Sequence, residues 1–263
     1  MEKVGFGLCL ILFAYRAHEK YRLIVAANRD EFYHRPAAQA HFWADHPDVL
    51  AGRDLEKMGT WMGVTCGGRF AALTNVRNPR EQTAGKRSRG ELPAGFLTGS
   101  AGPEAYMRDA LDKRELYPGY NLLAGDRKDL YYYSNVGNRV QQLSPGIYGV
   151  SNHLLDTDWP KVKKGKEALA AIIGGGPDED GSMPEKLLTL LQSSDPAPDE
   201  LLPDTGIPLE RERMLSPMFI QSEDYGTRCS TVVLMSDAEI RFIERVYSKD
   251  GTDQRNFVIP LRG

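Results

Sequence analysis

The chain has 263 residues, of which 41% are hydrophobic and 26% charged, and its formal net charge is −3. These values are typical of a globular protein with a sizeable core, and the slightly acidic balance argues against a main role in binding nucleic acid, which requires a basic face. No linker-like stretch divides the sequence, so we expect one domain over residues 1–263.

Two apolar runs, 8–15 and 21–27, are separated by the polar residues 16–20 and predict a β-hairpin. Both runs are almost continuously apolar, which indicates a sheet that is covered on both faces. The apolar stretch that starts at Val4 has only about twelve residues, too few to cross a bilayer as a helix, and lacks a convincing cleavage site. We therefore expect a buried strand, no stable membrane insertion and a cytoplasmic protein.

The middle of the chain mixes strands with helices. The predicted strands are 61–66, 69–76, 120–125, 130–134 and 147–151. The predicted helices are 104–116, 158–173 and 183–191. Gly67-Gly68 supplies a hairpin turn, the glycines 174–176 supply a C-cap, and Ser182 with Glu185 fits a capping box.

The C-terminal part returns to strands. A loop rich in proline and aspartate covers 195–208, after which 230–235 and 240–247 predict a hairpin and 256–260 an edge strand. The order of elements is not a regular βαβ alternation, which disfavours Rossmann and barrel folds. The sequence predicts an α+β fold of antiparallel sheets with helices on their outer faces.

Three scattered cysteines, Cys9, Cys66 and Cys229, argue against a disulfide framework and a zinc site, and we expect no metal or cofactor. A buried cysteine is most often a core thiol, and this is the simpler interpretation of all three. The alternative for Cys9 depends on the charged pair after the second strand. If that pair lies where Cys9 emerges, Arg29 lowers the pKa of the thiol and Asp30 orients a donor or an amine.

Several short motifs, in order along nearly the whole chain, resemble one known family. They are Cys9-Leu-Ile-Leu-Phe, Asn28-Arg29-Asp30-Glu31, Arg35-Pro36, Phe42-Trp43, Gly59-Thr60-Trp61-Met-Gly63, Ala72-Leu-Thr-Asn75, Ser88-Arg89-Gly90, Tyr120-Asn121-Leu122, Gly149-Val-Ser151-Asn152 and Gly226-Thr227-Arg228-Cys-Ser230-Thr231. Because separate motifs match in order, the resemblance to the NRDE family, also called the transport and Golgi organization protein family, is specific.

That family is similar to the N-terminal nucleophile hydrolases, so the resemblance implies a four-layer αββα sandwich of two mainly antiparallel sheets. In cysteine members, which resemble penicillin V acylase and bile salt hydrolase, the first residue of the mature chain is the nucleophile and its α-amine is the base. An α-amine with a pKa of roughly 7.7–8.0 titrates near working pH, so no histidine is required. The resemblance makes Cys9 the nucleophile and Arg29 and Asp30 its supporting pair.

Three further residues are carried over from the family motifs. Asn75 and Asn152 become candidates for oxyanion donation and amine positioning, and Arg228 becomes a second cation at the site. Such donors matter because they stabilise charge that develops only in the transition state. Without the resemblance, each asparagine is interpreted as a turn residue at a strand end.

The family begins with Met-Cys, whereas here Leu8 stands in the place of the methionine and eight residues precede Cys9. Three explanations are open. Leu8 is an alternative start, so that residues 1–7 are not part of the native protein; or residues 1–8 are a propeptide that is cleaved before Cys9; or Cys9 gains no free amine and the protein is not a hydrolase. We favour the first explanation.

The stretch 77–89 is basic, with one acid, Glu81. Its cations are Arg77, Arg80, Lys86, Arg87 and Arg89. Such a run is most simply interpreted as a solvated loop. The sharper hypothesis is a cationic rim for an anionic ligand such as a carboxylate, an acyl-CoA phosphate or a haem propionate, because arginine suits bidentate contacts.

Two functions follow from these interpretations. The first is an amidohydrolase that cleaves a small acylated amide through a thioester on Cys9. The second is a non-enzymatic carrier or chaperone that holds a hydrophobic anion such as haem or acyl-CoA in the same pocket, since the resemblance includes eukaryotic members associated with haem and lipid trafficking. Either way, the expected partner is a small molecule and not nucleic acid.

Overall fold

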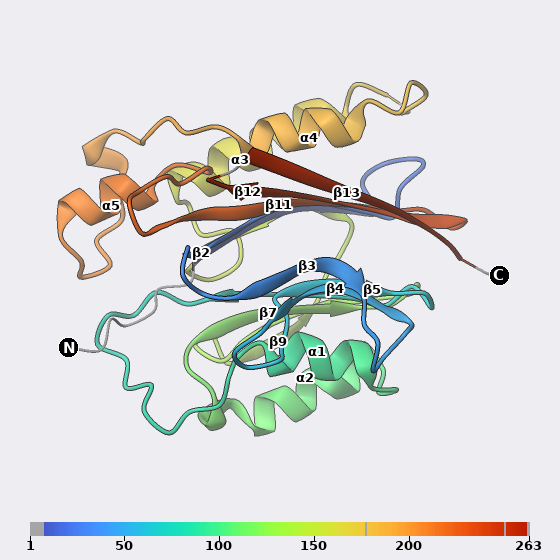
Figure 1. The fold of residues 1–263 in the computed structure, drawn as a ribbon, viewed down its shortest axis with the longest axis horizontal. Helices are drawn as coiled ribbons and strands as arrows, with labels where there is room; N and C mark the ends of the chain where they lie inside the picture. The colour runs from blue at the N-terminus through green and yellow to red at the C-terminus, as the bar shows by residue number, and fades with distance from the viewer. Residues whose placement is uncertain (1–7, 177, 250, 262–263) are drawn as a thin grey trace.

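The computed structural model describes residues 8–176, 178–249 and 251–261, which form two stacked antiparallel sheets between two outer layers of helices (Figure 1). Across the six-stranded sheet the order is β10 (Gly146–Val150), β1 (Leu8–Tyr15), β2 (Leu23–Phe32), β11 (Tyr225–Met235), β12 (Glu239–Ser248) and β13 (Gly251–Pro260). Across the seven-stranded sheet it is β3 (Ala37–Phe42), β4 (Val49–Asp54), β5 (Met62–Thr65), β6 (Phe70–Asn75), β7 (Tyr120–Gly125), β8 (Leu130–Ser134) and β9 (Arg139–Gln142). The predicted four-layer αββα sandwich is confirmed.

Helices cover the outer face of each sheet (Figure 1). The helices α3 (Pro160–Ile173) and α4 (Met183–Leu191) pack on the six-stranded sheet, and α1 (Glu91–Thr98) and α2 (Pro103–Asp112) pack on the seven-stranded sheet. A shorter helix, α5 (Leu209–Leu215), precedes β11, and 3-10 turns occupy Arg114–Leu116 and Asp199–Leu201. Within the described ranges, no helix is both long and apolar enough to cross a membrane.

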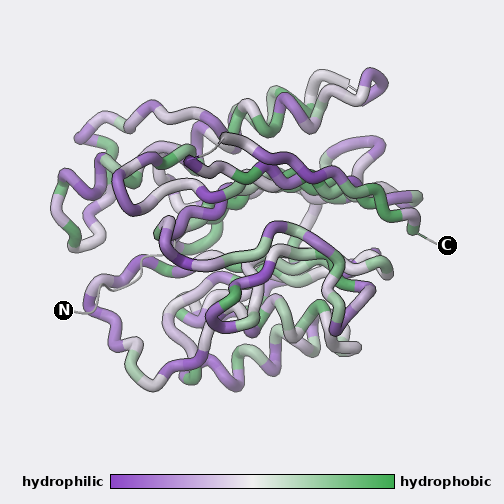
Figure 2. Tube along the Cα trace, in the orientation of Figure 1, coloured by the Kyte–Doolittle hydropathy of each residue, from purple (hydrophilic) through white to green (hydrophobic). Residues whose placement is uncertain are grey.

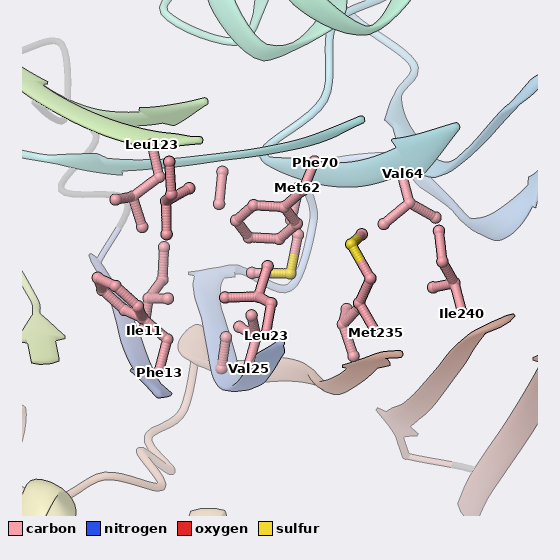
Figure 3. Close-up of a cluster of buried hydrophobic side chains, with 14 of the residues drawn as sticks. Ile11, Phe13, Leu23, Val25, Met62, Val64, Phe70, Leu123, Met235 and Ile240 are labelled. Atoms are coloured by element: carbon pink, nitrogen blue, oxygen red, sulfur yellow. The ribbon is translucent and has the colours of Figure 1, made fainter. Parts of the chain in front are cut away.

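The sandwich has three apolar layers because both faces of each sheet are covered. In the central layer, Phe13 and Val25 of one sheet face Phe70 of the other (Figure 3). Their chain neighbours Leu12 and Ile24 point away from it, into the layer beneath α3 and α4. This two-sided burial explains why the first two strands are continuously apolar instead of alternating. Figure 2 shows the result, with hydrophobic stretches in the strands and hydrophilic ones along the outer loops.

The structure adds elements that the sequence pattern does not predict. They are the strands β3, β4 and β9 and the helices α1 and α5. Helix α1 contains Pro93 and Gly95, which are poor helix formers, so its packing on the sheet outweighs local propensity. Strand β9 is a mostly exposed edge strand without apolar alternation. The predicted helix over 104–116 ends at Asp112 and is followed by a 3-10 turn.

The capping box predicted at the start of α4 is wrong. Ser182 makes no capping hydrogen bond, and Glu185 pairs with Arg245 of β12 at 2.8 Å. The N–H of Met183 donates instead to Oδ1 of the buried Asp178, at 2.9 Å. Arg245 of the neighbouring sheet thus binds the glutamate. Asp178, which lies outside the predicted motif, accepts the hydrogen bond from the free N–H group at the start of the helix.

Gly165 lets α3 lie close to β1, because a Cβ there would lie 2.6 Å from Cδ1 of Leu12. Replacing a helical glycine by alanine normally stabilises a protein, by roughly 0.5–1 kcal/mol. Here we expect Gly165→Ala to lower the free energy of unfolding by about 1–3 kcal/mol. Leu12 is fully buried, so the added methyl group would overpack the core around it.

Chemical denaturation measures this effect. The exposed neighbour Glu167 provides the control, since Glu167→Ala is expected to change the free energy of unfolding by less than about 0.5 kcal/mol. A Gly165→Ala protein as stable as the native one would contradict the packing of α3 on β1.

Candidate functional site

A cavity of ≈ 760 Å³ opens between the sheets at the end of the sandwich where β1 begins. Its wall comes from β1, β2, β11 and β12 of one sheet, from β3, β4 and β6 of the other, and from the loop before α1. Five of the six candidate catalytic residues line it, namely Cys9, Arg29, Asp30, Asn75 and Arg228. The fold thus brings together residues that are far apart along the chain.

One row across the six-stranded sheet carries two thiols and a cation. Cys9 of β1 pairs with Arg29 of β2, and Arg29 pairs with Cys229 of β11. Directly opposed residues of a sheet point to the same face, so all three face the cavity. Two strand spacings place the cysteine Cα atoms about 9–10 Å apart, beyond the reach of a disulfide.

The Cys9 thiol is protonated in this environment. Cys9 is only 7% exposed, and this burial raises the pKa of its thiol to about 12. The negative charge of Asp30 raises it further, whereas Arg29 and a backbone hydrogen bond from Asp30 lower it. The predicted influence of Arg29 is therefore present but smaller than that of burial, so the thiol needs a base to become a nucleophile.

Asp30 is buried with only one of its carboxylate oxygens engaged. Oδ1 accepts a hydrogen bond from the hydroxyl of Thr227 at 2.6 Å, and Oδ2 has no partner. Burial raises the pKa of Asp30 to about 6, and the charge of Lys161 acts in the opposite direction. At neutral pH, Asp30 is thus a carboxylate with one free, buried oxygen.

The two arginines on this wall are held differently. Arg29 lies 3.8 Å from Glu31, a long ion pair between half-buried groups. Arg228 donates from one terminal nitrogen to the carbonyls of Phe32, at 2.8 Å, and Arg35, at 3.1 Å. Burial lowers the pKa of Arg228, and the nearby charge of Arg29 lowers it further. Arg228 therefore adds positive charge that main-chain carbonyls position without neutralising it.

The two candidate asparagines occupy different places. Asn75, at the end of β6, lines the cavity, whereas Asn152 is fully buried and is not among the lining residues. The amide of Asn152 donates to the carbonyl of Asn75 at 3.0 Å and accepts from the hydroxyl of Ser151 at 3.1 Å. The single proton of that hydroxyl is shared between this amide oxygen and the carbonyl of Cys9, which lies 2.9 Å from the hydroxyl oxygen. Asn152 is thus linked to Cys9 and Asn75 through hydrogen bonds from behind the cavity wall.

The basic stretch 77–89 divides into two parts. Arg77 is not among the residues that line the cavity. It forms a buried ion pair with Glu212 at 2.5 Å, and its guanidinium lies 4.9 Å from the ring centre of Trp159. Lys86, Arg87 and Arg89 line the cavity. Arg77 is therefore not part of the hypothetical cationic rim.

Among the rim residues, Arg87 and Arg89 differ in exposure and pairing. Arg87 is half exposed and pairs with Glu91 at 2.5 Å. Arg89 is deeper and donates to the carbonyl of Gly119 at 3.1 Å, and burial lowers its pKa. Like Arg228, Arg89 is held by a carbonyl and keeps its charge available to a ligand.

Two buried charged residues near the site are absent from the sequence prediction. Glu244 of β12 lines the cavity, accepts from the N–H of Ala40 at 2.6 Å and is hydrogen-bonded to Cys229. Burial raises the pKa of both Glu244 and Cys229. Lys161, in the first turn of α3, is buried behind the sheet. Neither residue stands in a recognisable motif. Charged residues of strands and helices usually lie on exposed faces, so the local sequence does not indicate that these two are buried.

The arrangement offers a thiol, two carbonyl-held arginines and a buried carboxylate around one cavity. These groups suit covalent catalysis on a carbonyl substrate and recognition of an anion. In the part of the chain that the structure describes, no group of three or more histidine, cysteine or acidic residues is placed to hold a metal ion.

Comparisons with known proteins agree with this architecture. The family model described as Transport and Golgi organisation 2 matches residues 8–249. A Transport and Golgi organization protein 2 homolog of Bos taurus is 39% identical over 260 residues, which cover 90% of this chain and 92% of the bovine protein.

Two solved structures are similar in fold. One is the Caenorhabditis elegans ortholog of N-acylethanolamine-hydrolyzing acid amidase, with a TM-score of 0.51, 13% identity and coverage of 86% of this chain and 92% of that one. The other is a mutant of conjugated bile acid hydrolase from Clostridium perfringens, with a TM-score of 0.50, 8% identity and coverage of 97% of both chains. At such identities the likeness shows the fold alone.

Proposed function

The chain belongs to the Transport and Golgi organisation 2 family, and from this premise we propose that it is a cysteine N-terminal nucleophile hydrolase that cleaves a small acylated amide. The structural likeness to amidohydrolases supports a hydrolase, and the cavity around Cys9 supports the choice of nucleophile. In this proposal Cys9 is the first residue of the working protein.

The free oxygen of Asp30 is the observation that carries the proposal. A buried carboxylate oxygen without a donor is costly, and such groups in native proteins call for a partner. Asp30 pairs with Leu8 across β1 and β2, so the main chain of Asp30 lies opposite the residue whose carbonyl carbon is bonded to the nitrogen of Cys9. A chain that starts at Cys9 places an α-amine there, and this amine is a hydrogen-bond donor of the required kind.

In the proposed reaction this α-amine acts as the base and carries the proton. It takes the Cys9 proton, and the thiolate attacks the amide carbonyl to give a tetrahedral oxyanion. Collapse forms a thioester and breaks the C–N bond, and the departing amine takes the proton back from the ammonium. Water then hydrolyses the thioester, which releases the acyl group as a carboxylic acid and regenerates the thiol. Asn75 is the proposed oxyanion donor, and Asn152 supports it through the carbonyl of Asn75.

The test compares protein that begins at Cys9 with its Cys9→Ala variant against a panel of N-acyl amides. A burst of released amine that requires the thiol supports the hydrolase. No burst with any amide, from protein shown by mass spectrometry to begin at Cys9, counts against it.

The wall of the cavity favours a substrate with a carboxylate near the scissile amide. Replacing Arg89 or Arg228 by Gln is expected to lower kcat/KM for N-acyl amino acids by about 10- to 100-fold, which corresponds to the loss of a hydrogen bond between charged groups. Neutral N-acyl amides of equal chain length are expected to lose much less. The ratio of the two kcat/KM values is the measurement.

Arg87 provides the matched control for this prediction. Its guanidinium already pairs with Glu91, so Arg87→Gln is expected to leave that ratio unchanged. Equal losses for charged and neutral substrates in the Arg89 and Arg228 variants would contradict recognition of the carboxylate.

The second candidate function is a carrier of haem or an acyl-CoA. It is favoured by the size of the cavity, ≈ 760 Å³, within the usual range for ligand pockets, and by its arginines. Tight binding of haem or acyl-CoA that is indifferent to Cys9→Ala, without a burst, would support the carrier over the hydrolase.

A further inference from the structure

A second pocket, of ≈ 440 Å³, lies at the end of the sandwich away from Cys9. It is formed by the loop between β1 and β2, the turn between β7 and β8 and the turn between β11 and β12, so both sheets contribute to it. Cys9 is near the start of β1, whereas the second pocket begins at Arg16, directly after its end. The strand rises about 20 Å from Cys9 to Tyr15, so the two cavities are separate.

The described residues that line the second pocket are all charged or histidine. They are Arg16, His18, Glu19, Lys20, Arg22, Arg127, Lys128, Asp129 and Asp237. Five of them are cations and three are acids, so a surplus of two positive charges remains. Since this set contains no apolar side chain to pack against an acyl chain or an aromatic ring, the ligand that suits it is small, polar and anionic.

His18 supplies a hydrogen-bond donor that has no acceptor. Its Nδ1 accepts from the main-chain N–H groups of Lys20, at 3.1 Å, and Tyr21, at 3.2 Å. Nδ1 therefore carries no proton, and the ring proton lies on Nε2. Within the described part of the chain, this Nε2 is buried and has no hydrogen-bond partner. A buried donor of this kind calls for an acceptor.

Arg22 supplies a second donor of the same kind. Its Nη2 donates to Oδ1 of Asp237 at 2.6 Å, whereas its Nη1 is buried and has no partner among the described residues. The side chain of Asp237 is 86% exposed, so this ion pair neutralises Arg22 only weakly. A buried N–H without an acceptor costs about 1–3 kcal/mol, and one ligand with several acceptor oxygens would satisfy both donors.

Hydrogen bonds join the walls of the second pocket across the two sheets. The carbonyl of Lys128 accepts from the hydroxyl of Tyr15 at 3.0 Å and from the guanidinium of Arg16. The ammonium of Lys20 donates to the carbonyl of Asp178 at 3.4 Å. Carbonyls thus hold Arg16 and Lys20 in place without neutralising them. Because these cations are already positioned, less order is lost when an anion binds.

We propose that the second pocket binds a phosphate monoester, with Nε2 of His18 and Nη1 of Arg22 as its hydrogen-bond donors. Such a group carries about −1.5 to −2 charges at pH 7 and three strong acceptor oxygens. It therefore matches both the surplus charge and the two donors without acceptors, whereas a carboxylate supplies only one charge. The volume also leaves room for a small polar group beside the phosphate.

Two sources offer this chemistry, a soluble phosphate monoester and the headgroup of phosphatidic acid. Isothermal titration calorimetry of the full chain distinguishes them, with glycerol 3-phosphate as one probe and vesicles of phosphatidylcholine with and without phosphatidic acid as the other. We expect saturable binding of at least one phosphate probe with a Kd below about 1 mM. Lactate, a small carboxylate, is expected to bind at least about tenfold more weakly.

Two variants connect the binding to the second pocket. Arg22→Gln removes a charged donor and is expected to raise the Kd about 10- to 100-fold. His18→Asn keeps a side-chain acceptor for the same two main-chain N–H groups but lacks the Nε2 donor, and is expected to raise the Kd about tenfold. Arg108→Gln, on an exposed arginine of α2 outside the pocket, is the matched control and is expected to leave the Kd unchanged.

The outcomes are distinct. Binding of glycerol 3-phosphate that both pocket variants weaken supports a soluble ligand, and binding only of phosphatidic acid vesicles, weakened by the same variants, supports a lipid headgroup. No binding of either probe, equal binding of lactate, or an unchanged Kd in both folded variants overturns the proposal. The measurement uses no amide substrate, so its result does not depend on the proposed hydrolase.

Circular dichroism melting reports whether the variants are folded. Lys128→Gln replaces Arg22→Gln if the latter does not fold, because it removes a charge from the pocket and keeps the main-chain carbonyl that joins the walls. Its Kd is expected to rise about three- to tenfold, as for loss of one partly exposed charge. An unchanged Kd in folded Lys128→Gln protein would likewise overturn the proposal.

Discussion

Protein that begins at Cys9 is expected to release the amine of its substrate about 10²- to 10⁴-fold faster than protein that retains residues 1–8, the range that loss of a general base typically costs. Burial raises the pKa of the Cys9 thiol to about 12, so very little thiolate exists at neutral pH. An α-amine on the same residue removes this obstacle, because it accepts the proton within hydrogen-bond reach. A peptide nitrogen cannot do so.

Rapid mixing with an N-acyl amide measures the burst, and mass spectrometry of the acid-quenched protein detects the acyl thioester on Cys9. Cys9→Ala is expected to abolish both signals. Cys66→Ala is the control, because Cys66 is absent from the cavity wall. Equal rates for the two chain starts, or a burst that survives Cys9→Ala, would contradict the mechanism. Protein isolated from its own host is expected to begin at Cys9, and retention of Met1 would contradict that start.

Replacing Glu212 by Gln is expected to lower the free energy of unfolding by about 3–5 kcal/mol, since it leaves a buried charge without its partner. The side chains of Arg77 and Glu212 are only 2% and 3% exposed. The guanidinium also lies over the ring of Trp159, so it cannot turn to solvent without losing that packing. Glutamine keeps the size of the side chain, so the change isolates the charge.

Urea denaturation measures the effect, and Glu210→Gln on the exposed side of α5 is the control, with an expected change below about 0.5 kcal/mol. Combining Glu212→Gln with Arg77→Met is expected to cost less than the sum of the two single changes, because the double variant has no unpaired charge. A loss below about 1 kcal/mol in Glu212→Gln would contradict the buried ion pair.

This ion pair connects α5 to the site. The N–H of Arg77 donates to the carbonyl of Asn152 at 2.8 Å, and the amide of Asn152 donates to the carbonyl of Asn75. Loss of the pair is therefore expected to disturb the candidate oxyanion donor as well as the stability of the fold.

The sequence was most informative where local chemistry and burial agree. The runs 8–15 and 21–27 are apolar on both faces because both faces are covered, so the first hairpin was predictable. The edge strand β9 and the helix α1 lack such a pattern, since one is polar and the other contains proline and glycine. Their presence depends on neighbours that the local sequence does not reveal.

By itself, the sequence determined the class of fold and, through its motifs, indicated Cys9, Arg29 and Asp30 as candidate residues of a site. Only the tertiary structure decided what surrounds them. Lys161 stands in a helix turn where a lysine normally faces solvent, and Glu244 stands in a strand that comes near the end of the chain. Burial and charge pairing are set by segments that are distant along the chain, and it is this packing that raises the pKa of the Cys9 thiol and leaves one oxygen of Asp30 without a donor.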